Sequence, residues 1–183
     1  DDLDVEGALH VAFVRSQVAH GTIEEIDTSE ALSMPGVVGV FVASDLDLEP
    51  VPPSMPMFNA TMTRTRLATD RVRYVGEPVA AVVAESHVQA VDAAESMFAD
   101  VEPLPAVVSV HDSVKDETLL FPEAGTNTVF AMPASGADVC AGCDVTVELS
   151  FRNHRLAPCP LETRAAIAKW ETIDGVEHLT QWS

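Results

Sequence analysis

The sequence predicts an α+β domain followed by a β-rich tail. Its 183 residues are 47% hydrophobic, enough to bury the core of one domain. In the first 110 residues, short β-branched runs alternate with segments of helical periodicity. From Val145 onward the apolar residues instead follow strict two-residue alternation. The composition changes between residues 111 and 144, which separates the two parts.

The first two strands are predicted at residues 8–14 and 22–26, where apolar residues are dense and partly alternating. A turn at His20-Gly21 predicts that they form a hairpin. Asp27 lies three residues before Glu30, an arrangement typical of a helix start, and Met34-Pro35-Gly36 ends that short helix.

A second group of elements surrounds a long loop. The continuous apolar run 37–42 predicts a strand covered on both faces, and the four prolines within 44–70 predict an irregular loop. A second buried strand is predicted at 79–84. Ser86 and Gln89 form a capping box for the best-defined helix, whose core face is expected to carry the residues Val88, Val91, Ala94 and Phe98.

The remaining elements are mainly strands. Residues 101–110 predict a strand at a sheet edge or with a bent entry, because Pro103 and Pro105 interrupt it. Residues 111 to about 140 predict loops with turn clusters at 121–125 and 133–136. A half-exposed strand is expected at 145–151, and a hairpin is expected from 163–170 and 176–182 around Asp174-Gly175.

Charge excludes several classes of partner. Acidic residues outnumber basic residues 29 to 10, and the resulting net charge of −19 disfavours nucleic acid and acidic lipid surfaces. No apolar run approaches the roughly 20 residues of a membrane span. Three cysteines without framework spacing and the lack of a leader-like start favour the cytoplasm. The chain starts without methionine and stops within a predicted strand, so we expect it to be part of a longer polypeptide.

Motifs that carry chemistry are sparse. The nine glycines form no phosphate-binding loop, and the six histidines form no metal-binding pattern. Cys140 and Cys143 have the spacing of a redox pair or half a metal site, but a turn before a strand is the favoured interpretation. Cys159 lies between two prolines. We therefore assign no catalytic, cofactor-binding or metal-binding residue, and interpret the many carboxylates as a solvated acidic face.

The segment 153–166 is the most unusual part of the sequence. Its two prolines predict a kinked connection, and Glu162 and Arg164 would share one face of a strand beginning there. The segment could form a rigid joint with an ion pair, or it could frame a cofactor channel.

Several blocks together resemble the molybdenum-binding large subunit of the xanthine dehydrogenase and aldehyde oxidase family, which includes carbon monoxide dehydrogenase large chains. They cover nearly the whole chain and occur in the family's order, at 9–16 (LHVAFVRS), 26–31 (IDTSEA), 35–37 (PGV), 45–46 (DL), 72–80 (VRYVGEPVA), 89–95 (QAVDAAE), 102–107 (EPLPAV) and 153–164. Val101, where the family commonly has tyrosine, and Met97-Phe98-Ala99 depart from this pattern.

The resemblance implies an α/β-hammerhead domain with a mixed β-sheet and two helices over 1–110, a connecting segment over 111–143, and the first strands of a molybdopterin-binding domain over 144–183. It implies a molybdenum hydroxylase whose full subunit holds molybdopterin, with [2Fe-2S] clusters and FAD on partner domains or subunits. The family's cofactor-side glutamine would fall just beyond Ser183, and its catalytic glutamate lies farther on. Glu162 matches a family glutamate to which we assign a structural role.

The leading hypothesis is therefore an oxidoreductase fragment that is inert alone, covers the cofactor domains and contacts the iron–sulphur and flavin partners. A second copy of the chain is a further candidate partner. The alternative is a free-standing, non-catalytic module that docks a basic partner through its acidic surface and the loop 44–70. A redox or metal protein using Cys140 and Cys143 ranks last.

Overall fold

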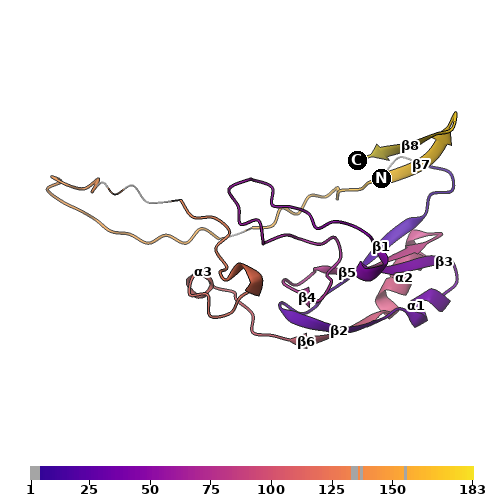
Figure 1. Ribbon diagram of the computed structural model, residues 1–183, viewed down its shortest axis with the longest axis horizontal. Coiled ribbons are helices and arrows are strands. Elements are labelled where there is room, and N and C mark those ends of the chain that lie inside the picture. The colour runs from indigo at the N-terminus through magenta and orange to yellow at the C-terminus, as the bar shows by residue number, and fades with distance from the viewer. Residues whose placement is uncertain (1–4, 133–135, 137, 155) are drawn as a thin grey trace. The chain divides into compact units, whose positions relative to one another are not determined.

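The structure is a computed structural model that describes residues 5–132, 136, 138–154 and 156–183 (Figure 1). The chain divides into two compact units, one formed by Leu9–Met132 and the other by Asp1–Ala8 with Pro133–Ser183. The first unit holds two three-stranded sheets, and the second holds a two-stranded hairpin. This mixed α and β architecture agrees with the predicted fold class.

Sheet I contains strands β1 (His10–Arg15), β5 (Pro78–Ala84) and β3 (Val37–Val42), in the order β1-β5-β3. Both edge strands run antiparallel to β5. Val14 and Val42 each pair with Ala80, on opposite sides of it. Helix α2 (His87–Ser96) contacts all three strands, so it covers one face of the sheet.

Sheet II contains β4 (Arg71–Val72), β2 (Gly21–Asp27) and β6 (Phe98–Pro103), in the order β4-β2-β6. The predicted hairpin between the first two strands is therefore wrong. Both strands exist, but β1 pairs with β5 and β2 pairs with β4 and β6. The hairpin was expected because the two strands are close in the sequence. Their actual partners, β5 for β1 and β4 and β6 for β2, lie much later in the chain.

The core lies between the helices and the sheets and is built from small residues. Val72, Val79 and Val82 are its largest fully buried side chains, and Ala90 and Ala93 of α2 are also fully buried. Alanines let the helix backbone approach the sheet closely. Burying each valine contributes on the order of 1.5–3 kcal/mol.

Helix α2 starts as predicted, because the Ser86 hydroxyl accepts a hydrogen bond from the backbone N–H of Gln89. The predicted core face is only partly right, since Ala94 packs against the core but two other members do not. Val88 is 66% exposed, and Phe98 lies in β6 with an exposed side chain. The fully buried residues of the helix are instead Ala90 and Ala93.

Strand β3 also differs from its prediction. It lies at the edge of sheet I, and Val38 and Phe41 are exposed rather than covered. Before it, helix α1 (Ser29–Ser33) ends at Met34 as expected. Asp27 serves the start of that helix, since its carboxylate accepts hydrogen bonds from the Ser29 N–H and hydroxyl at 2.9 and 2.6 Å.

The long loop after β3 is confirmed. It contains a single turn of 3₁₀ helix, η1 (Ala43–Asp45), and an isolated bridge between Val51 and Arg64. The strand predicted at 101–110 lies earlier in the chain than expected. It is β6, which ends at Pro103, and a short helix, α3 (Val110–Ser113), follows. Proline donates no hydrogen bond to a ladder, so β6 cannot continue in sheet II.

The segment that follows α3 is held by polar contacts. It includes a 3₁₀ turn, η2 (Pro122–Ala124). The Asn127 amide donates to the carbonyls of Ser113 and Thr118, while its carbonyl accepts from the N–H of Leu120. The Asp116 carboxylate accepts from the Asn127 N–H at 2.7 Å. This loop is therefore a structured part of the first unit.

In the second unit, β7 (Ile167–Ile173) and β8 (Val176–Trp182) form the predicted hairpin. Asp174 and Gly175 both have positive φ, as a two-residue type I′ turn requires. The strand predicted at 145–151 is wrong, because these residues are exposed and have no regular structure. A strand needs a backbone partner, and none is present among the described residues. Nor do those residues include a helix long and apolar enough to cross a membrane.

Candidate functional site

The most prominent surface of the first unit is the face of sheet I opposite α2, called the outer face below. It is formed by Val11 and Phe13 of β1, Phe41 of β3, and Ala81 and Val83 of β5. Phe13 and Phe41 both pair with Ala81, so two aromatic side chains flank one small residue in a single row. Val11 and Phe13 are 50% and 48% exposed.

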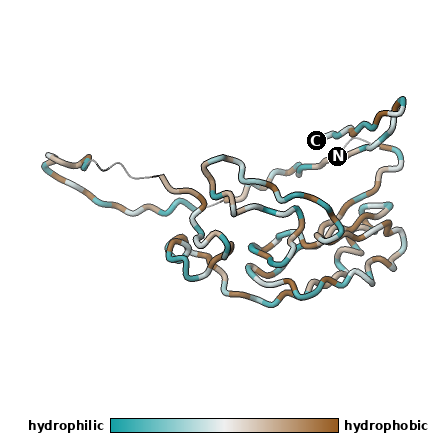
Figure 2. The backbone as a smooth tube through the Cα atoms, viewed as in Figure 1, coloured by the Kyte–Doolittle hydropathy of each residue, from teal (hydrophilic) through white to brown (hydrophobic). Residues whose placement is uncertain are grey.

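The outer face follows from strand geometry. Successive side chains point to opposite sides of a strand, so burying Val14, Ala80 and Val82 against the core turns their neighbours outward. These outward neighbours are also apolar, as expected for strands covered on both faces. Figure 2 colours the backbone by hydropathy, and hydrophobic residues follow one another along these strands. A contiguous apolar surface of this kind is typical of an interaction site.

A second feature is a cavity of about 550 Å³ beside β4, lined in part by Arg73, Tyr74 and Phe121. Arg73 Nε donates to the Leu120 carbonyl at 2.9 Å, and its guanidinium lies 4.5 Å from the centre of the Phe121 ring. Arg73 therefore holds Leu120 and Phe121, which also line the cavity, close to the end of β4. The charged side chains on the lining are mixed in sign: Arg64, Arg73, Asp70, Glu77 and Glu123.

All three cysteines lie on the surface. Cys140, Cys143 and Cys159 are free and exposed. Cys140 and Cys143 lie in a turn in which the Cys143 N–H donates to the Cys140 carbonyl at 3.0 Å, as the favoured interpretation expects. Within the described residues, no group of three or more histidine, cysteine or acidic side chains could hold a metal ion.

The unusual segment 153–166 has no regular structure where it is described, and Glu162 and Arg164 are exposed. They form no ion pair with each other, and the strand begins at Ile167 rather than Thr163. The predicted joint with an ion pair is therefore not formed. Arg155 of this segment, and 133–135 and 137 near a predicted turn, lie outside the described residues.

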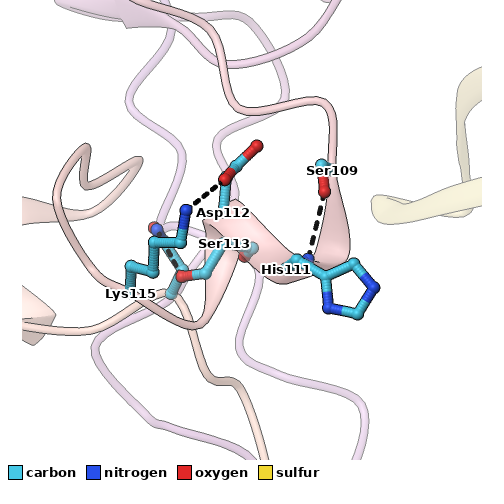
Figure 3. Close-up of polar contacts among 6 residues, drawn as sticks. Ser109, His111, Asp112, Ser113 and Lys115 are labelled. Carbon is cyan, nitrogen blue, oxygen red and sulfur yellow. Dashed lines mark hydrogen bonds and ion pairs between the residues drawn. The ribbon is translucent and has the colours of Figure 1, made fainter.

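The polar contacts that were not predicted from the sequence include those of His20 and Asp112. His20 is only 3% exposed, and its Nδ1–H donates to the Pro105 carbonyl at 2.7 Å, which ties the chain after β6 to the start of β2. His20 and Pro105 are far apart in the sequence, so no local sequence pattern could have predicted their hydrogen bond. Around α3, Lys115 Nζ lies 2.6 Å from an Asp112 carboxylate oxygen, and this hydrogen-bonded charge lowers the pKa of Asp112 (Figure 3).

Known proteins resemble this chain over most of its length. The family described as "Aldehyde oxidase and xanthine dehydrogenase, a/b hammerhead domain" matches residues 1–105. The nicotine 6-hydroxylase large subunit of Paenarthrobacter nicotinovorans is 36% identical, over 100% of this chain and 23% of that protein. This chain therefore spans about a quarter of the length of that relative.

Solved structures agree. The aldehyde oxidoreductase of Desulfovibrio desulfuricans superposes with a TM-score of 0.62 at 30% identity, over 70% of this chain and 14% of that one. A Cu,Mo-CO dehydrogenase superposes with a TM-score of 0.59 at 35% identity, over 67% and 15% of the two chains. Sequence and fold thus give one answer: the chain belongs to the aldehyde oxidase and xanthine dehydrogenase family and carries its α/β-hammerhead domain.

Proposed function

We propose that this chain is the hammerhead part of the large subunit of a molybdenum-dependent oxidoreductase, and that its task there is structural. The outer face of sheet I carries this proposal. It presents the row Phe13, Ala81 and Phe41 to solvent, although its strands have the composition of strands covered on both sides. The remainder of the same subunit would cover this face.

Among the residues that the structure describes, the lining of the cavity beside Arg73 does not fit a molybdopterin cofactor. Such a group carries phosphates, which require an excess of cations or a set of convergent backbone N–H groups. The cavity beside Arg73 instead sets two arginines against three carboxylates. We therefore propose that molybdopterin and the catalytic residues lie in other parts of the enzyme, with [2Fe-2S] clusters and FAD on partner domains or subunits.

The domain organisation is part of the same proposal. Residues 1–110 would form the hammerhead domain, 111–143 a connecting segment and 144–183 the start of a molybdopterin-binding domain. The exposed apolar residues Val145, Val147, Leu149 and Phe151 support the last assignment, because their alternation suits a strand that gains its partner from a later part of the subunit. The enzyme would work in the cytoplasm.

The test is a charge on the outer face in the complete enzyme. Phe13→Glu should lower the yield of assembled enzyme at least about tenfold, because docking would bury an unpaired carboxylate. The melting temperature of the 183-residue chain should stay close to that of the parent, since Phe13 is half exposed in it. Co-purification of the subunits and molybdenum content measure assembly.

Val88→Glu is the matched control. Val88 is an apolar and more exposed side chain on α2, away from the outer face. We expect this variant to assemble within about twofold of the parent. Normal assembly of Phe13→Glu, or equal losses for both variants, would contradict the proposal.

The alternative, a free-standing binding module, draws on the loop after β3. Leu48, Met55 and Met57 are exposed there, in a chain of net charge −19. That function predicts assembly unaffected by Phe13→Glu, together with capture of a basic partner that is lost when this loop is shortened.

A further inference from the structure

The first unit contains a second cavity, of about 710 Å³, whose lining shares only Phe13 with the outer face. It lies where the end of β1, helix α2 and the start of β6 meet, and we call it the edge groove. Two continuous stretches, residues 12–18 and 97–101, form its walls. Val91, Ala94 and Glu95 of α2 complete its lining.

Backbone edges form these walls. Side chains alternate along a strand, so a surface that touches every consecutive residue of a stretch meets the edge of the strand rather than one of its faces. β1 is an edge strand of sheet I, and β6 is an edge strand of sheet II. Each therefore has one side whose N–H and C=O groups have no ladder partner among the described residues.

The lining also shows which side chains an occupant would need. Val91, Ala94, Met97 and Val101 are apolar and only partly buried, so they would accept apolar side chains. The wall formed by α2 and β6 carries two carboxylates, Glu95 and Asp100, and neither has an ion-pair partner among the described residues.

Arg15, the cation on the opposite wall, is already engaged. It donates to the Gly76 carbonyl at 2.9 Å and lies 5.6 Å from the centre of the Phe13 ring. Glu95 and Asp100 are therefore available to pair with a cation of another molecule. The net charge of −19 adds long-range attraction for basic groups.

We propose that the edge groove binds an extended segment of another polypeptide, with alternating apolar and basic side chains, as an added β-strand. Its backbone would pair with the free edges of β1 or β6. Its apolar side chains would pack on α2, and its basic side chains would face Glu95 and Asp100. Only Phe13 is shared with the outer face, and Glu95 and Asp100 belong to α2 and β6, which are not part of that face. The inference therefore does not depend on the proposed function.

The test uses the 183-residue chain and synthetic peptides of about seven residues, the length of a typical strand. A peptide alternating valine and lysine should bind at least about tenfold more tightly than one alternating valine and glutamate. Backbone N-methylation of alternate residues should weaken the lysine peptide by a similar factor, because it removes hydrogen bonds and leaves the charge intact. Calorimetry gives the affinities, and amide NMR shifts at 12–18 and 97–101 locate the peptide.

Charge reversal on the chain completes the test. The double variant Glu95→Lys and Asp100→Lys should weaken the lysine peptide at least about tenfold and strengthen the glutamate peptide. Asp47→Lys, an exposed carboxylate outside the groove, should stay within about twofold of the parent.

Three results would overturn the inference. Equal binding of the lysine and glutamate peptides would remove the role of charge, and undiminished binding of the N-methylated peptide would exclude strand addition. Self-association of the chain that the lysine peptide reverses would show that the groove receives a second copy instead.

Discussion

At the scale of single residues, polar side chains near element ends fix the local structure. Asp27 is an example, because its carboxylate accepts two hydrogen bonds from Ser29 at the start of α1. The Ser29 hydroxyl is the larger cause, and the Ser29 N–H the second, of a lowered Asp27 pKa. The sequence placed this helix start correctly, since the pattern involved is local.

The lowered pKa makes a first prediction. A carboxyl whose pKa is lower in the folded state stabilises the fold above its unfolded pKa, and this contribution is lost as pH falls through the folded pKa. Ser29→Ala should raise the Asp27 pKa towards its ordinary value. NMR titration measures it, with Ser33→Ala as the control because the Ser33 hydroxyl donates only to the Glu30 carbonyl. An unchanged pKa in Ser29→Ala would contradict this account.

Gly36 supplies the second prediction. It has a φ of +80°, and a Cβ there would overlap the side-chain amide of Gln89, which also accepts a hydrogen bond from Ser86 at the start of α2. Gly36→Ala should cost about 1–2 kcal/mol from backbone strain, with an added loss from displacing Gln89. Gly125→Ala, at φ +68° in open space, should show the strain alone. Equal losses in denaturant unfolding would exclude the Gln89 contact.

At the scale of elements, sequence patterns identified strands and helices more reliably than their partners. The runs that became β3 and β5 were recognised from composition, and the Asp174-Gly175 hairpin from its turn. Pairing could not be inferred, because β5 joins β1 and β3 across long stretches of chain. Helical periodicity also predicted the core face of α2 only in part, since alanines give a weaker hydrophobic signal than the exposed Val88.

The two faces of sheet I make a third prediction. Val82 is fully buried against the core, so Val82→Ala should lower the free energy of unfolding by about 2–3 kcal/mol. Val11→Ala, on the outer face of the same sheet, should cost less than about 1 kcal/mol in the 183-residue chain. Urea denaturation compares them. Similar losses of unfolding free energy in the two variants would contradict this account, because they would mean that the outer face is already covered in this chain.

At the scale of the whole molecule, the sequence allowed the family to be recognised, although little of its chemistry could be located. The family blocks are spread along the chain, and the comparisons confirm the family. The outer face and the edge groove could not be predicted, because each is assembled from strands distant in sequence. The absence of assigned catalytic residues remains a prediction that the complete enzyme must test.

The central claim is that the outer face of sheet I docks onto the remainder of the large subunit. Hydroxyl-radical footprinting of Phe13 and Phe41 tests it most directly, by comparing the 183-residue chain with the assembled enzyme and using Val88 as the exposed reference. We predict that both phenylalanines react in the isolated chain and become at least about tenfold less reactive in the enzyme, relative to Val88. Equal reactivity of Phe13 and Phe41 in the two samples would contradict the claim.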